Sequence, residues 1–128
     1  MDKKIVLCID DEEVILDFVK IVLEMDNFNV ITSNSGENAI KLLQRNDINI
    51  DLVLLDLMMP GMNGWETLKK IREIPYRKST PVVIFTGNLS EKYNLNSNKL
   101  SSEISDFILK PVDYEDLIKR IKNILKIK

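Results

Sequence analysis

The chain has no histidine and only one cysteine, Cys8, among its 128 residues. The missing histidines exclude zinc sites built on imidazole and any histidine general base. A single thiol cannot form an internal disulfide, and a thiol-metal cluster is not expected. Because Cys8 lies inside the apolar run 5–9, we interpret it as a small buried hydrophobe with no redox role.

Long apolar runs and a strong charge of one sign are also missing. No apolar stretch approaches the roughly 18 residues of a membrane span, and the N-terminus lacks signal-peptide anatomy, so we expect a cytoplasmic location and no membrane partner. The 18 basic and 20 acidic residues argue against direct nucleic-acid binding, since phosphate backbones require clustered cations. The length and the 45% apolar content predict one domain, residues 1–128.

Short apolar runs alternate five times with longer amphipathic ones. Strands are predicted at 4–9, 29–33, 52–55, 82–85 and 107–109. Helices are predicted at 12–25, at 35–44 with Ser35 as N-cap, from Asn63-Gly64 until Pro75, and after the capping residue Asp113. In the first helix, one broad apolar face is expected from Val14, Ile15, Phe18, Val19, Ile21 and Val22. The Asn- and Ser-rich segment 88–105 predicts a fourth helix that is short, irregular or mobile.

This alternation predicts an α/β fold with a doubly wound, five-stranded parallel sheet. Strands that are apolar throughout are typical of a parallel sheet covered by helices on both faces. In such sheets, ligands bind beyond the carboxyl ends of the strands. Polar side chains follow four of the predicted strands at that position, namely Asp10 and Asp11, Asp56, Thr86, and Lys110.

These strand ends indicate a metal-assisted phosphoryl site. Mg²⁺ (or Mn²⁺) prefers oxygen ligands, which Asp10, Asp11 and Asp56 supply. With metal present, Asp56 is the candidate nucleophile that forms an acyl phosphate. A cap role for Asp56 is the weaker alternative, because Pro60 and Gly61 separate it from the next helix.

The other strand-end residues have simpler alternatives. Lys110 would contact a phosphate oxygen, although most lysines are solvated. Thr86 would donate its hydroxyl to a phosphoryl oxygen, although threonine is also common in strands. We interpret Glu12 and Glu13 as acids that favour a helix N-terminus, and we predict a cis peptide bond between Lys110 and the following proline.

Four motifs in order resemble the receiver domain of bacterial two-component response regulators. They are Cys-Ile-Asp-Asp-Glu at 8–12, Leu-Leu-Asp-Leu-Met-Met-Pro-Gly-Met-Asn-Gly at 54–64, Phe-Thr-Gly at 85–87 and Asp-Phe-Ile-Leu-Lys-Pro at 106–111. The resemblance implies a flavodoxin-like (βα)5 fold. It also implies phosphoryl transfer to Asp56 from a histidine kinase or a histidine phosphotransfer protein, and switching of a downstream protein target. The resemblance leaves open whether phosphorylation produces a homodimer.

The resemblance also implies residue roles. Mg²⁺ would be held by Asp10, Asp11, Asp56 and the backbone carbonyl of Met58, while Thr86 and Lys110 would contact the phosphoryl group. Phe107 matches the aromatic switch position, and Met58 and Asn88 match positions that tune dephosphorylation. The family carries a Gly-Ala pair where this chain has Glu103-Ile104.

Two alternatives to a phosphoacceptor domain remain to be weighed. A haloacid-dehalogenase-like phosphatase also forms an aspartyl phosphate, but it carries a second Asp two residues after the nucleophile, where this chain has Met58. A pseudo-receiver would lack an acid, the hydroxyl or the lysine, and none is missing. We therefore expect a regulator that catalyses only its own phosphorylation and dephosphorylation. The basic residues of the last helix are interpreted as a solvated face, with docking as the alternative; they are Lys119, Arg120, Lys122, Lys126 and Lys128.

Overall fold

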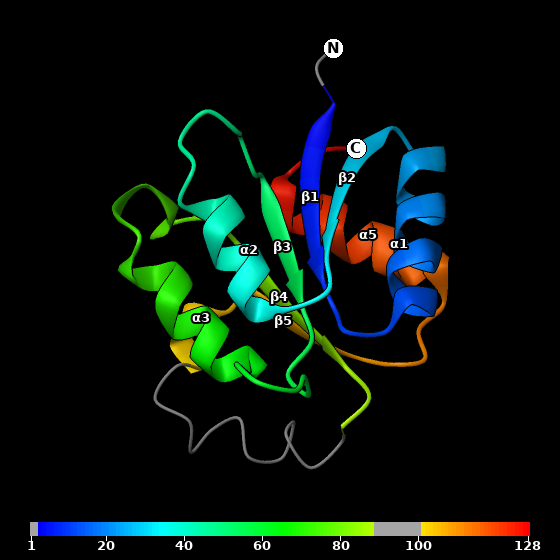
Figure 1. Cartoon of the computed structure of the whole chain (residues 1–128). Coiled ribbons are helices and arrows are strands. Elements are labelled where there is room, and N and C mark those ends of the chain that lie inside the picture. Colours follow the sequence, from blue (N-terminus) through cyan, green and yellow to red (C-terminus); the bar gives the residue numbers. More distant parts are fainter. Residues whose placement is uncertain (1–2, 89–100) are drawn as a thin grey trace.

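The computed structural model describes residues 3–88 and 101–128 (Figure 1). In chain order its elements are β1 (Lys4–Ile9), α1 (Glu13–Met25), β2 (Phe28–Ser33), α2 (Gly36–Leu43), β3 (Leu52–Leu55), α3 (Gly64–Glu73), the short 3₁₀ helix η1 (Pro75–Arg77), β4 (Val82–Thr86), the 3₁₀ helix η3 (Ser101–Glu103), β5 (Asp106–Leu109) and α5 (Tyr114–Leu125). The five strands form one sheet in the order β2-β1-β3-β4-β5, and every pairing is parallel. The predicted doubly wound fold is confirmed.

Helices cover both faces of the sheet, which explains why the strands are apolar throughout. Helices α2 and α3 lie on one face, and α1 and α5 lie on the other (Figure 1). Successive strand residues alternate between the two sides: Leu7 packs in the core beneath α2 and α3, and Cys8 packs beneath α1 and α5. Burial raises the pKa of the Cys8 thiol, as expected for an inert buried cysteine.

The predicted helix starts are confirmed by their caps. The Ser35 side chain accepts a hydrogen bond from the Asn38 amide at 3.1 Å. Asn63 forms a capping box with Glu66, with distances of 2.9 and 3.1 Å. Asp113 accepts from the amide two residues later at 3.2 Å. Each cap satisfies an amide at the helix start that lacks an intrahelical partner.

The predicted apolar face of α1 was wrong in part. The buried residues of this helix are Leu16, Val19 and Leu23, whereas Val14 and Ile21 are 77% and 60% exposed. Apolar residues lie around most of the circumference of α1, so their spacing does not identify the side that packs on the sheet.

Two further predictions concern the fourth helix and the lack of a membrane span. Residues 89–100 of the predicted fourth helix lie outside the described residues, so its form stays a prediction; η3 follows at 101–103. Within the described ranges, none of the helices has both the length and the apolar character needed to cross a membrane.

Arg77 closes the edge of the sheet where the strands begin. Its side chain is 5% exposed and donates hydrogen bonds to the carbonyl oxygens of Leu43, Arg45 and Ile48 at 3.0, 2.8 and 2.9 Å. These carbonyls belong to the end of α2 and to the connection that leads into β3. The guanidinium therefore fixes that connection through the backbone.

Arg72 on α3 extends this backbone clamp. It donates to the carbonyl oxygens of Arg77 and Thr80 at 2.9 and 2.8 Å, and to that of Glu103 at 2.7 Å. Its Nε atom also lies 3.2 Å from the Glu103 carboxylate. Glu103, which stands at a departure from the family pattern, thus ties η3 to α3.

Candidate functional site

The three predicted acids meet at the carboxyl edge of the sheet. Ile9 and Leu55 are paired in the register of β1 and β3, so Asp10 and Asp56 follow neighbouring strands at the same level. The Asp56 amide donates to the Ile9 carbonyl at 3.0 Å. One carboxylate oxygen from each of Asp10, Asp11 and Asp56 lies within 4.8 Å of the others. Asp10 and Asp56 are buried, and Asp11 is exposed.

Lys110 reaches this cluster from the end of β5. Its Nζ atom lies 2.5 Å from an Asp10 oxygen and 3.6 Å from an Asp56 oxygen. The Lys110 amide donates to the Thr86 carbonyl at 2.8 Å, and the Lys110-Pro111 peptide bond is cis, as predicted. The lysine is an ion-pair partner of two carboxylates, as predicted, so the alternative of a solvated side chain does not apply.

A hollow of about 510 Å³ opens beside the Asp56 carboxylate, and its lining includes Met58, Thr86, Asn88 and Lys110. Thr86 is fully buried, and its hydroxyl accepts a hydrogen bond from the Asn88 amide at 3.4 Å. The Met58 amide donates to an Asp56 oxygen at 3.4 Å, while the Met58 side chain is exposed at the rim. The predicted acceptor, hydroxyl and lysine therefore share one hollow.

The charges of this cluster act on one another. Burial, together with the neighbouring Asp10 charge, raises the pKa of Asp56 above its ordinary value, although Lys110 and a hydrogen bond from Thr86 oppose the shift. Burial lowers the pKa of Lys110, but its hydrogen bond to Asp10 and the charge of Asp56 outweigh that effect and raise the pKa overall. The lysine is therefore a cation at neutral pH, and it pairs with Asp10 and Asp56.

The donor set fits a hard divalent cation. One lysine leaves a net negative charge on Asp10, Asp11 and Asp56, whose oxygens converge within 4.8 Å. Carboxylate oxygens at this spacing match the ligands that Mg²⁺ uses, and Mg²⁺ keeps further positions for water or substrate oxygens. Two of these like-charged acids are buried, which is costly without compensation, and a divalent cation would supply it.

Phe107 lies deeper in the same part of the sheet. It is paired with Ile84, two residues before Thr86 on β4, so Phe107 and Thr86 lie on the same face of neighbouring strands. The ring is 8% exposed and packs in the core beneath α2 and α3. The structure therefore places Phe107 in the core, on the strand next to that of Thr86.

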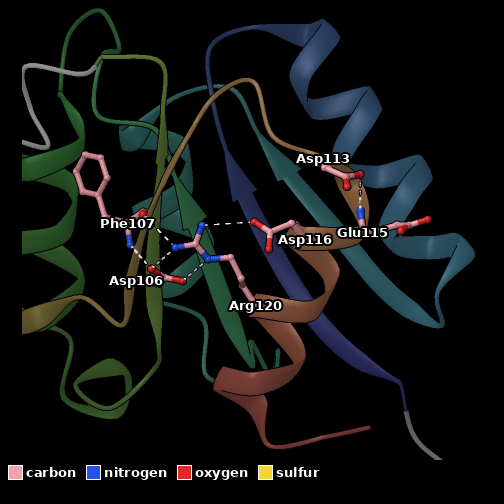
Figure 2. A network of polar contacts seen from close by, with 6 residues as sticks. All are labelled: Asp106, Phe107, Asp113, Glu115, Asp116 and Arg120. Atoms are coloured by element: carbon pink, nitrogen blue, oxygen red, sulfur yellow. Dashed lines mark hydrogen bonds and ion pairs between the residues drawn. The ribbon is translucent and has the colours of Figure 1, made fainter.

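Asp106 and Arg120 form a link that the sequence did not predict. Two nitrogen atoms of Arg120 lie 2.8 Å from the two Asp106 oxygens, and Asp106 also accepts from the Phe107 amide at 2.7 Å. Figure 2 shows Arg120 on α5 reaching β5, while the Phe107 ring points away from it. Asp116 adds a weaker ion pair at 3.6 Å. The backbone beside Phe107 is thus fastened to α5.

The basic residues of α5 are therefore not all solvated. Arg120 pairs with Asp106, and Lys122 pairs with Asp26 at 2.7 Å, so the prediction of a solvated face was wrong for these two residues. The sequence carries no signal for either pair. Each becomes apparent only when the topology brings α5 against β5 and against the end of α1.

A family model for the response regulator receiver domain matches residues 6–122. The chain belongs to this family. The transcriptional regulatory protein CpxR of Escherichia coli K12 is 39% identical over 121 residues, and the response regulator ArlR of Staphylococcus aureus is 36% identical over 122 residues; each match covers 94% of this chain. The family assignment supports the predicted receiver and gives no support to a haloacid-dehalogenase-like enzyme.

The similarity extends to solved receiver structures. The response regulator TrrA from Thermotoga maritima, solved in complex with Mg²⁺-BeF, has a TM-score of 0.80 and 28% identity, covering 94% of this chain and 97% of that one. The chain spans about half the length of the curated relatives that it matches, 49% of CpxR and 52% of ArlR.

Proposed function

We propose that this domain takes a phosphoryl group onto Asp56 from a histidine kinase or a histidine phosphotransfer protein, in a reaction that requires Mg²⁺ or Mn²⁺. The observation that carries the proposal is the convergence of Asp10, Asp11 and Asp56 within 4.8 Å at one edge of the sheet. The family assignment supports a phosphoacceptor rather than an enzyme with a separate substrate.

The metal ligands are proposed to be the three carboxylates and the backbone carbonyl of Met58. When bound, a divalent cation would neutralise part of the charge of these carboxylates and would act as a Lewis acid toward the phosphoryl oxygens. An Asp56 oxygen attacks phosphorus, and the bond from phosphorus to the donor histidine nitrogen breaks as the acyl phosphate forms. Lys110 and Thr86, which line the hollow with Asp56, donate to the phosphoryl oxygens and stabilise their charge.

The signal is proposed to pass from Thr86 to Phe107. When the Thr86 hydroxyl moves toward the phosphoryl group, space opens on the same face of the sheet, and the Phe107 ring, which already packs in the core, shifts toward that space. Because the Phe107 backbone is fastened to α5 through Asp106 and Arg120, this movement reaches the outer surface of the domain. A downstream protein that binds this surface then distinguishes the two states.

Phosphorylation by a small phosphodonor tests the proposal. Acetyl phosphate with Mg²⁺ is expected to add one phosphate to the protein, detected by intact mass, and chelation of Mg²⁺ is expected to prevent it. Asp56→Ala is expected to abolish the addition, whereas Asp47→Asn, an exposed acid that pairs with Arg45, serves as the matched control. Undiminished labelling of Asp56→Ala would reject Asp56 as the acceptor.

A further inference from the structure

Helix α1 carries an exposed apolar stripe on the side opposite the sheet. Val14, Phe18, Ile21 and Met25 are 77%, 38%, 60% and 83% exposed. Their spacing of four, three and four residues is that of the seam between two helices of a coiled coil. The buried positions of α1 lie on the other side, so this stripe contributes nothing to the core of the domain.

The apolar surface continues from α1 onto α5. A hollow of about 520 Å³ between the two helices is lined by Phe18, Val22, Met25, Asp26, Tyr114 and Ile118. Tyr114 is half-exposed at its edge. Elsewhere in the described ranges, the large apolar side chains with this degree of exposure are Met58 at the phosphoacceptor hollow and Tyr76. The gathering of the others over α1 and α5 therefore marks a contact surface.

Charge divides this surface into two ends. Helices α1 and α5 lie side by side and both begin at the carboxyl edge of the sheet (Figure 1). The acids gather at this first end: Glu13, Asp17, Asp113, Glu115 and Asp116. At the other end, Lys4 and Lys128 line a hollow beside Met25. The acids of that end are neutralised, since Glu24 pairs with Lys20 and Asp26 pairs with Lys122.

We infer that this surface binds a second copy of the chain, with the two α1 helices packed antiparallel about a two-fold axis. Such an axis sets the acidic end of each copy against the basic end of its partner, twice in one interface. A parallel arrangement would set like charges together. The apolar stripe supplies the centre of the interface, and the charged ends supply its direction and register. The inference does not depend on phosphorylation of Asp56.

Removal of one apolar side chain tests the centre of this interface. Sedimentation equilibrium of the 128-residue chain over a range of concentrations is expected to show a dimer. Ile21→Glu is expected to raise the dimer dissociation constant by more than about tenfold, because a charge replaces a buried isoleucine. Tyr76→Ser, on η1 at the far side of the sheet, is expected to leave the constant unchanged. A monomer at all concentrations, or a dimer that survives Ile21→Glu, would overturn the inference.

Charge reversal tests the antiparallel arrangement. One variant carries Asp17→Lys and Glu115→Lys at the acidic end, and a second carries Lys126→Glu and Lys128→Glu at the basic end. Each variant alone is expected to be monomeric, because like charges then meet at both ends. An equimolar mixture is expected to restore the dimer as a heterodimer, and about 0.5 M salt is expected to weaken that restoration. Circular dichroism confirms that each variant is folded.

The result of mixing the two charge variants, together with the state of the wild-type chain, distinguishes a second copy of the chain from a different protein as the partner. A mixture that stays monomeric while the wild-type chain dimerises would overturn the antiparallel arrangement. A wild-type chain that is monomeric alone, but whose α1 stripe is covered by a helix of a different protein, would overturn the second copy as the occupant.

Discussion

The two edges of the sheet differ in whether their buried charged side chains are fully paired within the chain. At the edge where the strands begin, Arg77 is buried and satisfied by three backbone carbonyls. At the edge where the strands end, Asp10 and Asp56 are buried, and Lys110 is shared between them with Asp11 close by. The first arrangement is complete within the chain, whereas the second leaves negative charge uncompensated.

This difference separates a structural use of charge from a functional one. A buried guanidinium that donates to three backbone carbonyls holds the backbone in place, and its removal would leave those carbonyls unpaired. A buried cluster of like charges costs stability, and it is maintained where the charge has a ligand to bind. The edge that costs stability is therefore the one expected to bind the metal and the phosphoryl group.

The largest expected effect on stability comes from the edge where the strands begin, where Arg77 is satisfied by backbone carbonyls. Arg77→Ala removes the donors of three backbone carbonyls, one of them in a fully buried bond, and is expected to cost about 3 kcal/mol of unfolding free energy, measured by urea denaturation. Arg45→Ala, which breaks an exposed ion pair with Asp47, is the control and is expected to cost less than about 1 kcal/mol. If both variants lost the same unfolding free energy, the proposed difference between the buried Arg77 and the exposed Arg45 would be contradicted.

The acidic edge, which carries Asp56, also depends on close backbone packing. A Cβ at Gly64 would lie 2.4 Å from the Asp56 carbonyl oxygen and 2.5 Å from the Leu57 Cα, whereas a Cβ at Gly87 would meet nothing closer than 4.0 Å. Gly64→Ala is therefore expected to cost about 2–3 kcal/mol, and Gly87→Ala well under 1 kcal/mol. Thermal unfolding of both variants measures this; a destabilised Gly87→Ala with an unaffected Gly64→Ala would contradict the packing.

Metal is expected to stabilise the acidic edge. Because Mg²⁺ binds the folded cluster and not the unfolded chain, a tenfold excess over its dissociation constant is expected to add about 1.4 kcal/mol. The measurement is the melting temperature with and without Mg²⁺. Asp11→Asn is expected to remove most of the increase, and Asp47→Asn is expected to retain it. Equal melting of the wild-type chain in both conditions would argue against the metal site.

The smallest expected effect is a gain in the stability of the metal-free protein. Asp56→Asn removes one charge from the cluster and is expected to stabilise the metal-free protein by on the order of 1 kcal/mol at neutral pH. Burial raises the pKa of Asp56 in the folded state, so folding takes up a proton between the ordinary and the raised pKa. The contribution of Asp56 to stability therefore falls as pH rises through this window.

The pH dependence provides the control for this gain. The difference in unfolding free energy between Asp56→Asn and the wild-type chain is expected to grow as pH rises from the ordinary aspartate pKa toward neutrality, and to shrink in acid. Urea denaturation at several pH values measures it without Mg²⁺. A variant that is less stable than the wild-type chain at neutral pH would count against an uncompensated cluster.

The acidic edge was predictable from the sequence because parallel strands end at a common edge. Asp10 and Asp56 follow apolar runs directly, and the paired residues Ile9 and Leu55 bring them together. Lys110 and Thr86 follow the same rule. The roles of Thr86, Phe107 and the Met58 carbonyl came from the family resemblance, and they stay predictions.

The satisfied edge and the outer face of α1 were not predictable in this way. Nothing in the sequence distinguishes the buried Arg77 from the exposed Arg45, since the burial of Arg77 depends on carbonyls that converge only in the folded chain. Helix α1 is apolar around most of its circumference, so periodicity alone did not show that Ile21 is exposed. Both features depend on tertiary packing rather than on local pattern.

A crystal structure of the chain with Mg²⁺ and beryllofluoride tests the central claim most directly. We predict one metal ion at about 2.0–2.1 Å from oxygens of Asp10, Asp11 and Asp56, with the fluoroberyllate on an Asp56 oxygen and within hydrogen-bond distance of Thr86 and Lys110. Binding of both groups elsewhere, with the three carboxylates uncoordinated, would contradict the account.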